Sequence, residues 1–255
     1  MSVCFSLPFL FQKYPPYSVW EYDGKKYHNE RTLATPRTGW NFIAQLRPWM
    51  PPELSALVWF ATDDSSTSPR VPVYGSNREI ATPYAGKGTQ DGTPAPVFQF
   101  DMGKAFWVQN MVSNFCYYRW QDAYPVVRER IDAIQESLAD HVKNIDGQLL
   151  RLYQDKGPDE AIAFATQFSV NTANIIHQQW MDFYGELFVR FRDFHIITPK
   201  EKESSCGCDA REPGLSDAVK KRIIKETGDH YEVATGTDGD SEGRKSQFLR
   251  VMDVQ

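Results

Sequence analysis

The segment that decides the fold runs from Asn29 to Pro48 and reads NERTLATPRTGWNFIAQLRP. Its first part, up to Gly39, is dense in polar and cationic side chains. In its second part apolar side chains recur at every second residue, which is the pattern of a β-strand. We therefore expect a strand over residues 31–47, with the dense polar residues before its apolar part forming a wall of a functional site. The apolar residues that would share one face of this strand are Trp40, Phe42, Ala44 and Leu46.

Further strands are predicted on both sides of this segment. Residues 54–61 read LSALVWFA, a nearly continuous apolar run that is typical of a strand buried on both faces. Residues 70–74 read RVPVY and follow a polar loop, so they predict a third strand. Upstream, an Asp23-Gly24 turn signal predicts a hairpin or a loop with short strands.

The chain turns helical after residue 104. Residues 106–118 form an aromatic-rich helical pattern. A long amphipathic helix of about seven turns should follow, because apolar residues recur at steps of three and four. Gly157-Pro158 should end it, and a further helix should occupy residues 159–191. The apolar residues of the long helix are Val127, Ile131, Ile134, Leu138, Val142, Ile145, Leu149 and Leu152.

The order of strands, long loop and helices predicts an α+β fold, in which mostly antiparallel strands are followed by a layer of long helices. We expect one domain over residues 1–234 and a flexible tail over 235–255, which is rich in Gly, Asp and Ser. Within the domain we expect strands over about 19–75, a long loop over 75–103, helices over about 104–192, a linker over 199–213 and a short helix over 215–226.

The composition narrows the function classes. The formal net charge is −5 and no basic stripe stands out, so we expect no nucleic-acid partner. No run approaches the ~20 apolar residues of a membrane span. The apolar start, Met1–Phe11, lacks a basic segment and a clean cleavage site. The default expectation is therefore a cytoplasmic protein, with secretion or a periplasmic location left open.

Four cysteines are candidates for nucleophilic or metal chemistry. Cys116 lies in the aromatic helix, where we expect a buried, inert thiol. Cys206 and Cys208 have no second Cys or His pair at zinc-site spacing, so we expect neither a metal nor another cofactor. Cys4 would become an N-terminal nucleophile only after cleavage behind Val3. It is therefore the weak candidate among otherwise unknown catalytic residues.

Two polar sets are candidates for binding a substrate. Arg31 and Arg37 flank several threonines, and a guanidinium group can hold a carboxylate through two parallel hydrogen bonds. The alternative is that both are ordinary surface arginines. Asn171 and Asn174 would share one helix face, where amides can complete an oxyanion hole. The alternative there is a helix kink or a hydrogen bond between helices.

Short segments spread over residues 25–232 occur in the order known from one enzyme family. In these segments the chain resembles the C-terminal half of the thiol dipeptidases of the N-terminal-nucleophile hydrolase superfamily, whose relatives include the secernins. The segments are Glu30–Thr35 with Thr38-Gly39, Gln45–Trp49, Val58–Ala61, Val71–Tyr74, Ala105–Trp107, Asn114-Phe115, Tyr153, Ser169–Asn174 and Glu226–Tyr231.

The resemblance implies a four-layer αββα sandwich and hydrolysis of dipeptides by an N-terminal cysteine. That cysteine would belong to the other half of the enzyme, so we expect a portion that lacks its nucleophile. The partners would be a dipeptide and either the missing half or a second copy, because an uncovered sheet edge favours self-association and a homo-oligomer. The alternative is a catalytically inactive interaction or oligomerisation module derived from such an enzyme. A metal-dependent hydrolase is the weaker third reading.

Overall fold

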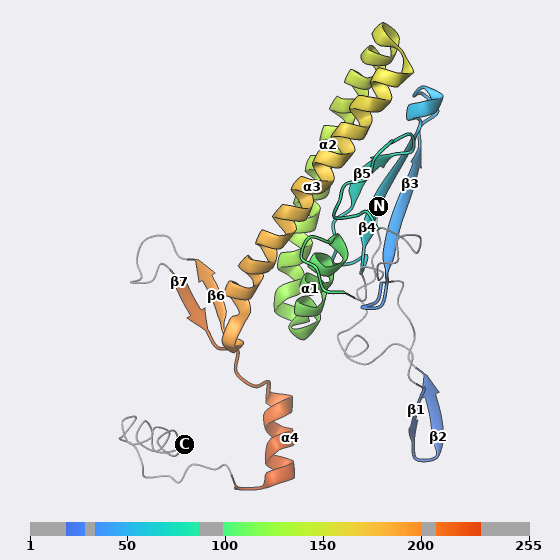
Figure 1. The fold of residues 1–255 in the computed structure, drawn as a ribbon. Coiled ribbons are helices and arrows are strands. Elements are labelled where there is room, and N and C mark those ends of the chain that lie inside the picture. The colour runs from blue at the N-terminus through green and yellow to red at the C-terminus, as the bar shows by residue number, and fades with distance from the viewer. Residues whose placement is uncertain (1–18, 29–33, 87–98, 200–207, 231–255) are drawn as a thin grey trace.

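The computed structural model describes residues 19–28, 34–86, 99–199 and 208–230 (Figure 1). Strands come first and long helices follow, which confirms the predicted α+β fold. The strands are β1 (Val19–Tyr22), β2 (Lys25–His28), β3 (Trp40–Leu46), β4 (Ala56–Thr62), β5 (Val71–Tyr74), β6 (Ile196–Pro199) and β7 (Cys208–Arg211). The helices are α1 (Ala105–Tyr118), α2 (Trp120–Lys156), α3 (Pro158–Phe191) and α4 (Asp217–Thr227), with single 3₁₀ turns at Pro52–Leu54 and Arg192–Phe194.

The central sheet has three antiparallel strands in the order β3-β4-β5. Phe42 lies opposite Phe60, which fixes the register and places the even-numbered residues of β3 on one face, as predicted. The expectation that β4 is buried on both faces was wrong. Leu57 and Ala61 of one face are buried, whereas the other face is only partly covered. The apolar run of β4 therefore does not mean that helices cover both sides of the sheet.

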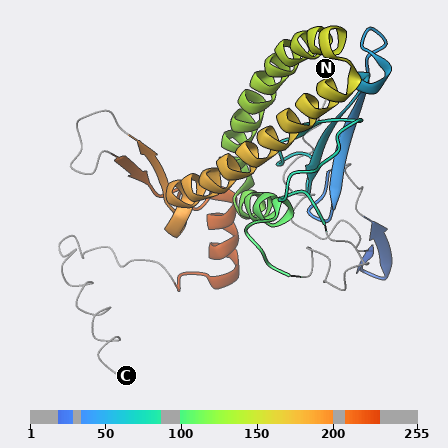
Figure 2. The same cartoon turned by 45° about the horizontal axis from the view of Figure 1, so that its top comes forward.

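Helices α2 and α3 form a long antiparallel hairpin that runs alongside the sheet (Figures 1 and 2). The hairpin turns at Gly157, whose φ of 92° is a conformation that L side chains rarely adopt. Pro158 then occupies the first turn of α3, where its missing N–H costs nothing. The predicted break at Gly157-Pro158 is thus confirmed.

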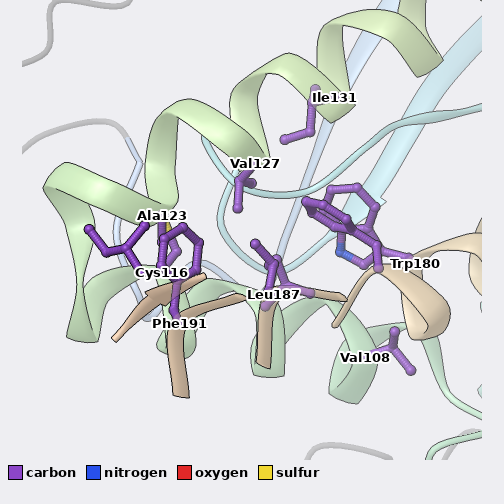
Figure 3. Close-up of a cluster of buried hydrophobic side chains, with 11 residues drawn as sticks. Val108, Cys116, Ala123, Val127, Ile131, Trp180, Leu187 and Phe191 are labelled. Carbon is purple, nitrogen blue, oxygen red and sulfur yellow. The ribbon is translucent and has the colours of Figure 1, made fainter. Parts of the chain in front are cut away.

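The buried core has two main parts. At the base of the hairpin, α1, α2 and α3 meet around Trp180, Leu187 and Phe191 (Figure 3). Higher up, Leu57 and Tyr74 of the sheet pack against the apolar side of the hairpin. Burial of apolar area stabilises by about 25 cal/mol per Å², so these contacts hold the sheet against the helices. The helical residues of this second part are Val142, Leu149, Ala161 and Ala165.

Three smaller elements lie outside this body (Figure 1). β1 and β2 form a hairpin whose turn residues, Asp23 and Gly24, both have positive φ, as a tight two-residue turn requires. β7 lies within the segment expected to be a linker and pairs with β6. α4 has no fully buried residue, and its N-terminus is capped by the Ser216 hydroxyl. Across the described residues, no helix combines the length and apolar character needed to cross a bilayer.

Candidate functional site at the polar edge of the sheet

The predicted polar wall meets a second polar segment at one end of the β3–β4 pair. The backbone N–H of Asp63, just after β4, donates to the carbonyl of Gly39, just before β3, at 2.9 Å. The side-chain amide of Asn41 donates to the Asp63 carbonyl at 3.1 Å. We call this region the polar edge. It comprises Thr35–Gly39, Asp63–Ser68 and the residues of α1 that contact them.

The loop that follows β4 is buried although it is polar. Asp63, Asp64, Thr67 and Ser68 are each 0% exposed. Asp63 has a φ of 61°, in the left-handed region that Asp tolerates better than most residues. A buried polar loop is unusual, because connecting segments normally run over the surface. This loop is therefore part of the supporting structure of the polar edge.

The two buried carboxylates of this loop receive their hydrogen bonds from neutral groups. Asp64 accepts from the backbone N–H and the hydroxyl of Ser66, at 2.8 and 2.7 Å, and from the hydroxyl of Tyr117. Asp63 accepts from the Asn110 side-chain amide at 2.9 Å. Buried carboxylates held only by neutral donors are costly, so they need a strong compensating reason.

Burial raises the pKa of Asp63 to about 6, and the charge of Asp64 adds to this rise. Hydrogen bonding from Asn110 and from the backbone of Asp64 offsets only part of this rise in the pKa. Burial, and then the Asp64 charge, also raise the pKa of Tyr117. Asp63 therefore changes its protonation state close to neutral pH.

Several buried polar atoms of the polar edge have no hydrogen-bond partner among the described residues. Such atoms are rare in folded proteins, and each one costs free energy. Atoms of this kind also occur elsewhere in the described residues, so they add to the cost of the polar edge without marking it on their own. Those of the polar edge are Asp63 Oδ2, Thr67 Oγ1, Ser68 Oγ and Ser113 Oγ.

Gln109 of α1 ties the helix to the sheet at this edge. Its amide oxygen accepts from the backbone N–H and hydroxyl of Thr62, at 3.0 and 2.6 Å. Its amide nitrogen donates to the Tyr84 hydroxyl at 3.3 Å and to the carbonyl of Pro69 at 3.4 Å. Sequence reasoning missed this residue. The available signal was an uncharged polar side chain in the first half of a largely apolar helix.

Arg37 is the predicted binding residue that lies at the polar edge. Its side chain is exposed, while its backbone N–H donates to the Thr35 hydroxyl at 3.3 Å. Thr35 is buried, and its backbone N–H donates to the Thr38 hydroxyl at 3.2 Å. This small turn presents Arg37 to solvent from a fixed base. Arg31, the other predicted arginine, lies outside the described residues.

The predicted amides lie on a different element. Asn171 and Asn174 are both exposed on α3. The adjacent residues of α3, Val170 and Ala173, lie on a different face of the helix and pack toward strand β5. An apolar hollow of about 280 Å³ lies between this part of α3 and the partly covered sheet face. Val58, Phe60, Val71 and Val73 supply its sheet side.

Cys116 is the cysteine whose side chain the structure describes. Cys116 is buried in α1, as predicted, and burial raises the pKa of its thiol. Because the thiolate is the nucleophile, this environment opposes a catalytic role. Cys4 and Cys206 lie outside the described residues, and Cys208 is described only as part of β7. Within the described ranges, no three His, Cys, Asp or Glu side chains gather as a metal site.

A comparison with known protein families matches just under half of the chain. The model of Peptidase family C69 matches residues 9–133, from before β1 into the first part of α2. The matched segment includes the whole polar edge. No curated protein matches the chain. Over residues 9–133, the chain is therefore similar to Peptidase family C69.

Proposed function

We propose that the protein acts as a cysteine-type dipeptidase. The relationship to Peptidase family C69 supports a hydrolytic, peptidase-type function in general. The observation that carries the proposal is that the family match encloses the polar edge. There an exposed arginine stands on a buried and rigid polar base. The Asn171 and Asn174 amides on α3 remain proposed as a second set of substrate contacts.

Arg37 supports dipeptides as the substrate class. A dipeptide has a free carboxylate one residue away from the bond to be cleaved, and a guanidinium group suits that carboxylate. The side chain of Arg37 is exposed, so a ligand can reach it. The buried loop behind it, Asp63–Ser68, would keep the wall in place rather than contact the substrate.

The proposed chemistry is attack of a cysteine thiolate on the peptide carbonyl. The amine leaves with a proton, and water then hydrolyses the thioester that remains. In an N-terminal-nucleophile mechanism the free α-amine takes the thiol proton. Cys116 is unsuited to this role, because it is buried and burial disfavours its thiolate. We therefore propose that the reacting cysteine lies outside the described residues, with Cys4 as the candidate within this chain.

Hydrolysis of a panel of dipeptides by the purified protein tests this function. We expect cleavage that iodoacetamide abolishes and that a metal chelator leaves unchanged. Cys116→Ala should retain activity, and it serves as the matched control for Cys4→Ala. Loss in Cys4→Ala alone would assign the nucleophile to Cys4. Activity lost to the chelator but not to iodoacetamide would contradict the thiol mechanism.

A non-catalytic interaction module is the second candidate function. The observation that favours it is the exposed apolar strand β3 at the edge of the sheet. In this case the protein would assemble with a partner or with itself, and none of the dipeptides would be cleaved. Absence of hydrolysis together with stable assembly would favour this candidate over the dipeptidase.

A further inference from the structure

Strand β3 forms an open edge of the central sheet. In the described part of the chain it pairs with β4 on one side only, and β5 lies on the side of the sheet nearest α3 (Figure 1). All its residues except Asn41 are exposed, with Leu46 at 77% and Trp40 at 60%. The strand contains no charged residue and no proline. Edge strands usually carry such residues because they prevent pairing with other chains.

The backbone bonds of β3 show which of its groups face the open edge. The bonds from Asp63 to Gly39 and from Arg47 to Ser55 mark the odd-numbered positions as the ones hydrogen-bonded to the neighbouring strand. In an antiparallel pair these positions alternate with positions whose N–H and C=O groups point away. The even-numbered residues, from Trp40 to Leu46, therefore present their backbone groups outward.

We propose that a second copy of this chain docks on this edge, with the two β3 strands antiparallel about a two-fold axis at Ile43. This is the register that pairs all the outward backbone groups of both strands. Phe42 then lies opposite Ala44 of the second copy, and Trp40 lies opposite Leu46. On the other face Asn41 lies opposite Gln45, and Ile43 lies opposite itself.

The strand is complementary to itself in this register. The large side chain of Phe42 meets the small one of Ala44, and the amides of Asn41 and Gln45 face each other across the pair. Two copies of a chain with a net charge of −5 repel each other in general. Since β3 is uncharged, the pairing brings no like charges together at the contact itself. The chemistry of the edge thus favours a second copy as its occupant.

The exposed apolar side chains of β3 supply the apolar area of the contact. Aromatic side chains bury roughly 150–250 Å² each, and Trp40 and Phe42 are 60% and 52% exposed. Ile43 and Leu46 are 54% and 77% exposed. A specific interface should bury about 1,000 Å² in total, so two copies reach this size only if the strand backbones and these side chains all pack together.

A charge exchange at the two-fold axis tests this proposal. Ile43 is 54% exposed, so the fold should accept Ile43→Lys and Ile43→Glu. Sedimentation velocity in reducing buffer, at up to roughly 100 μM protein, should show a dimer for the wild-type chain. Each variant alone should sediment as a monomer, because like charges would meet at the axis. An equimolar mixture of the two variants should recover the dimer.

A second pair of variants tests the backbone pairing. Ala44→Pro removes an outward N–H while leaving the bonds to β4 intact, so it should abolish the dimer. Ala44→Thr keeps the N–H and should retain the dimer. Circular dichroism checks that both variants are folded. A monomeric wild-type chain, a mixture of Ile43 variants that stays monomeric, or a folded Ala44→Pro variant that still dimerises would each overturn the proposal.

Discussion

The two ends of the β3–β4 pair differ in how their buried charged side chains are paired. At one end the Arg47 guanidinium, only 1% exposed, donates two hydrogen bonds of 2.8 and 2.7 Å to Asp146 of α2. It donates a third to the carbonyl of Leu54, and Tyr74 also donates to Asp146. At the other end Asp63 and Asp64 are buried, and within the described residues their hydrogen-bond donors are all neutral. The first end thus pairs its buried charge with an opposite charge, although Arg47 Nε has no partner among the described residues.

This difference shows how to separate structural from functional polarity in this protein. A charge that is matched by an opposite charge and by several hydrogen bonds fixes α2 to the sheet. Asp63 and Asp64 have no opposite charge beside them among the described residues, and the Thr67 and Ser68 hydroxyls nearby have no hydrogen-bond partner there. Both features reduce stability. Such a cost is typical of a functional site. Arg47 is therefore a structural residue and not a substrate ligand, although it lies only ten residues after Arg37 in the sequence.

The largest change in stability is expected at the end of the β3–β4 pair that holds the Arg47–Asp146 ion pair. Asp146→Ala leaves the Arg47 charge buried and unpaired, which should lower the free energy of unfolding by about 3–5 kcal/mol. Urea unfolding measures this change. Asp159→Ala is the control, because it removes an exposed partner of Arg78 and should cost below about 1 kcal/mol. Equal effects of the two substitutions would contradict the structural role of the Arg47–Asp146 pair.

A smaller effect, of opposite sign, is expected at the polar edge. The pKa of Asp63 is raised to about 6 from an ordinary 3.8, so the folded state holds the proton more tightly than the unfolded state. The contribution of Asp63 to stability therefore falls as the pH rises from about 4 to about 6, by roughly 3 kcal/mol in all. Asp63→Asn should remove this fall and stabilise the protein at pH 7.

Asp193→Asn is the matched control for this experiment. Asp193 also has a positive φ, of 55°, but its side chain is exposed. The substitution Asp193→Asn should therefore leave the dependence of stability on pH as it is in the wild type. The measurement is urea unfolding at a series of pH values between 4 and 8. If the free energy of unfolding changes over pH 4–6 by the same amount in the wild type and in Asp63→Asn, then Asp63 is not the group responsible.

The smallest effect concerns the second carboxylate of the polar edge. Tyr117→Phe removes the hydroxyl that donates to Asp64, which should cost about 1–3 kcal/mol. Thermal unfolding followed by circular dichroism measures the loss. Tyr22→Phe, at an exposed position, is the control and should have no measurable effect. If both tyrosine variants unfold at the wild-type temperature, the Tyr117 hydroxyl does not support the buried loop.

Much of the fold could be predicted from the sequence, because its main signals are local. The Gly157-Pro158 break, the Asp23-Gly24 turn and the apolar periodicity of α2 each depend on neighbouring residues. The pairing of β6 with β7 was missed, since strands of four residues are too short to show an alternating apolar pattern. The partial exposure of β4 was also missed, because an apolar run does not say which surfaces will cover it.

The candidate site was predicted only in part. The dense polar segment before β3 drew attention to Arg37, and the structure places it beside the loop after β4. The burial of Asp63 and Asp64 was not anticipated, since a run of Asp, Ser and Thr usually indicates an exposed loop. Their burial depends on Asn110 and Tyr117, which come from a helix some 50 residues later in the chain. Sequence alone does not show such long-range contacts.

Kinetics of dipeptide hydrolysis by Arg37→Ala test the central claim most directly. The control is Arg211→Ala, at an exposed position in β7. If Arg37 holds the substrate carboxylate at the polar edge, its loss should raise KM by about tenfold or more, which corresponds to ~1.4 kcal/mol of binding. Arg37→Lys should recover only part of this loss. A KM that is the same in wild type, Arg37→Ala and Arg211→Ala would contradict the placement of the substrate site at the polar edge.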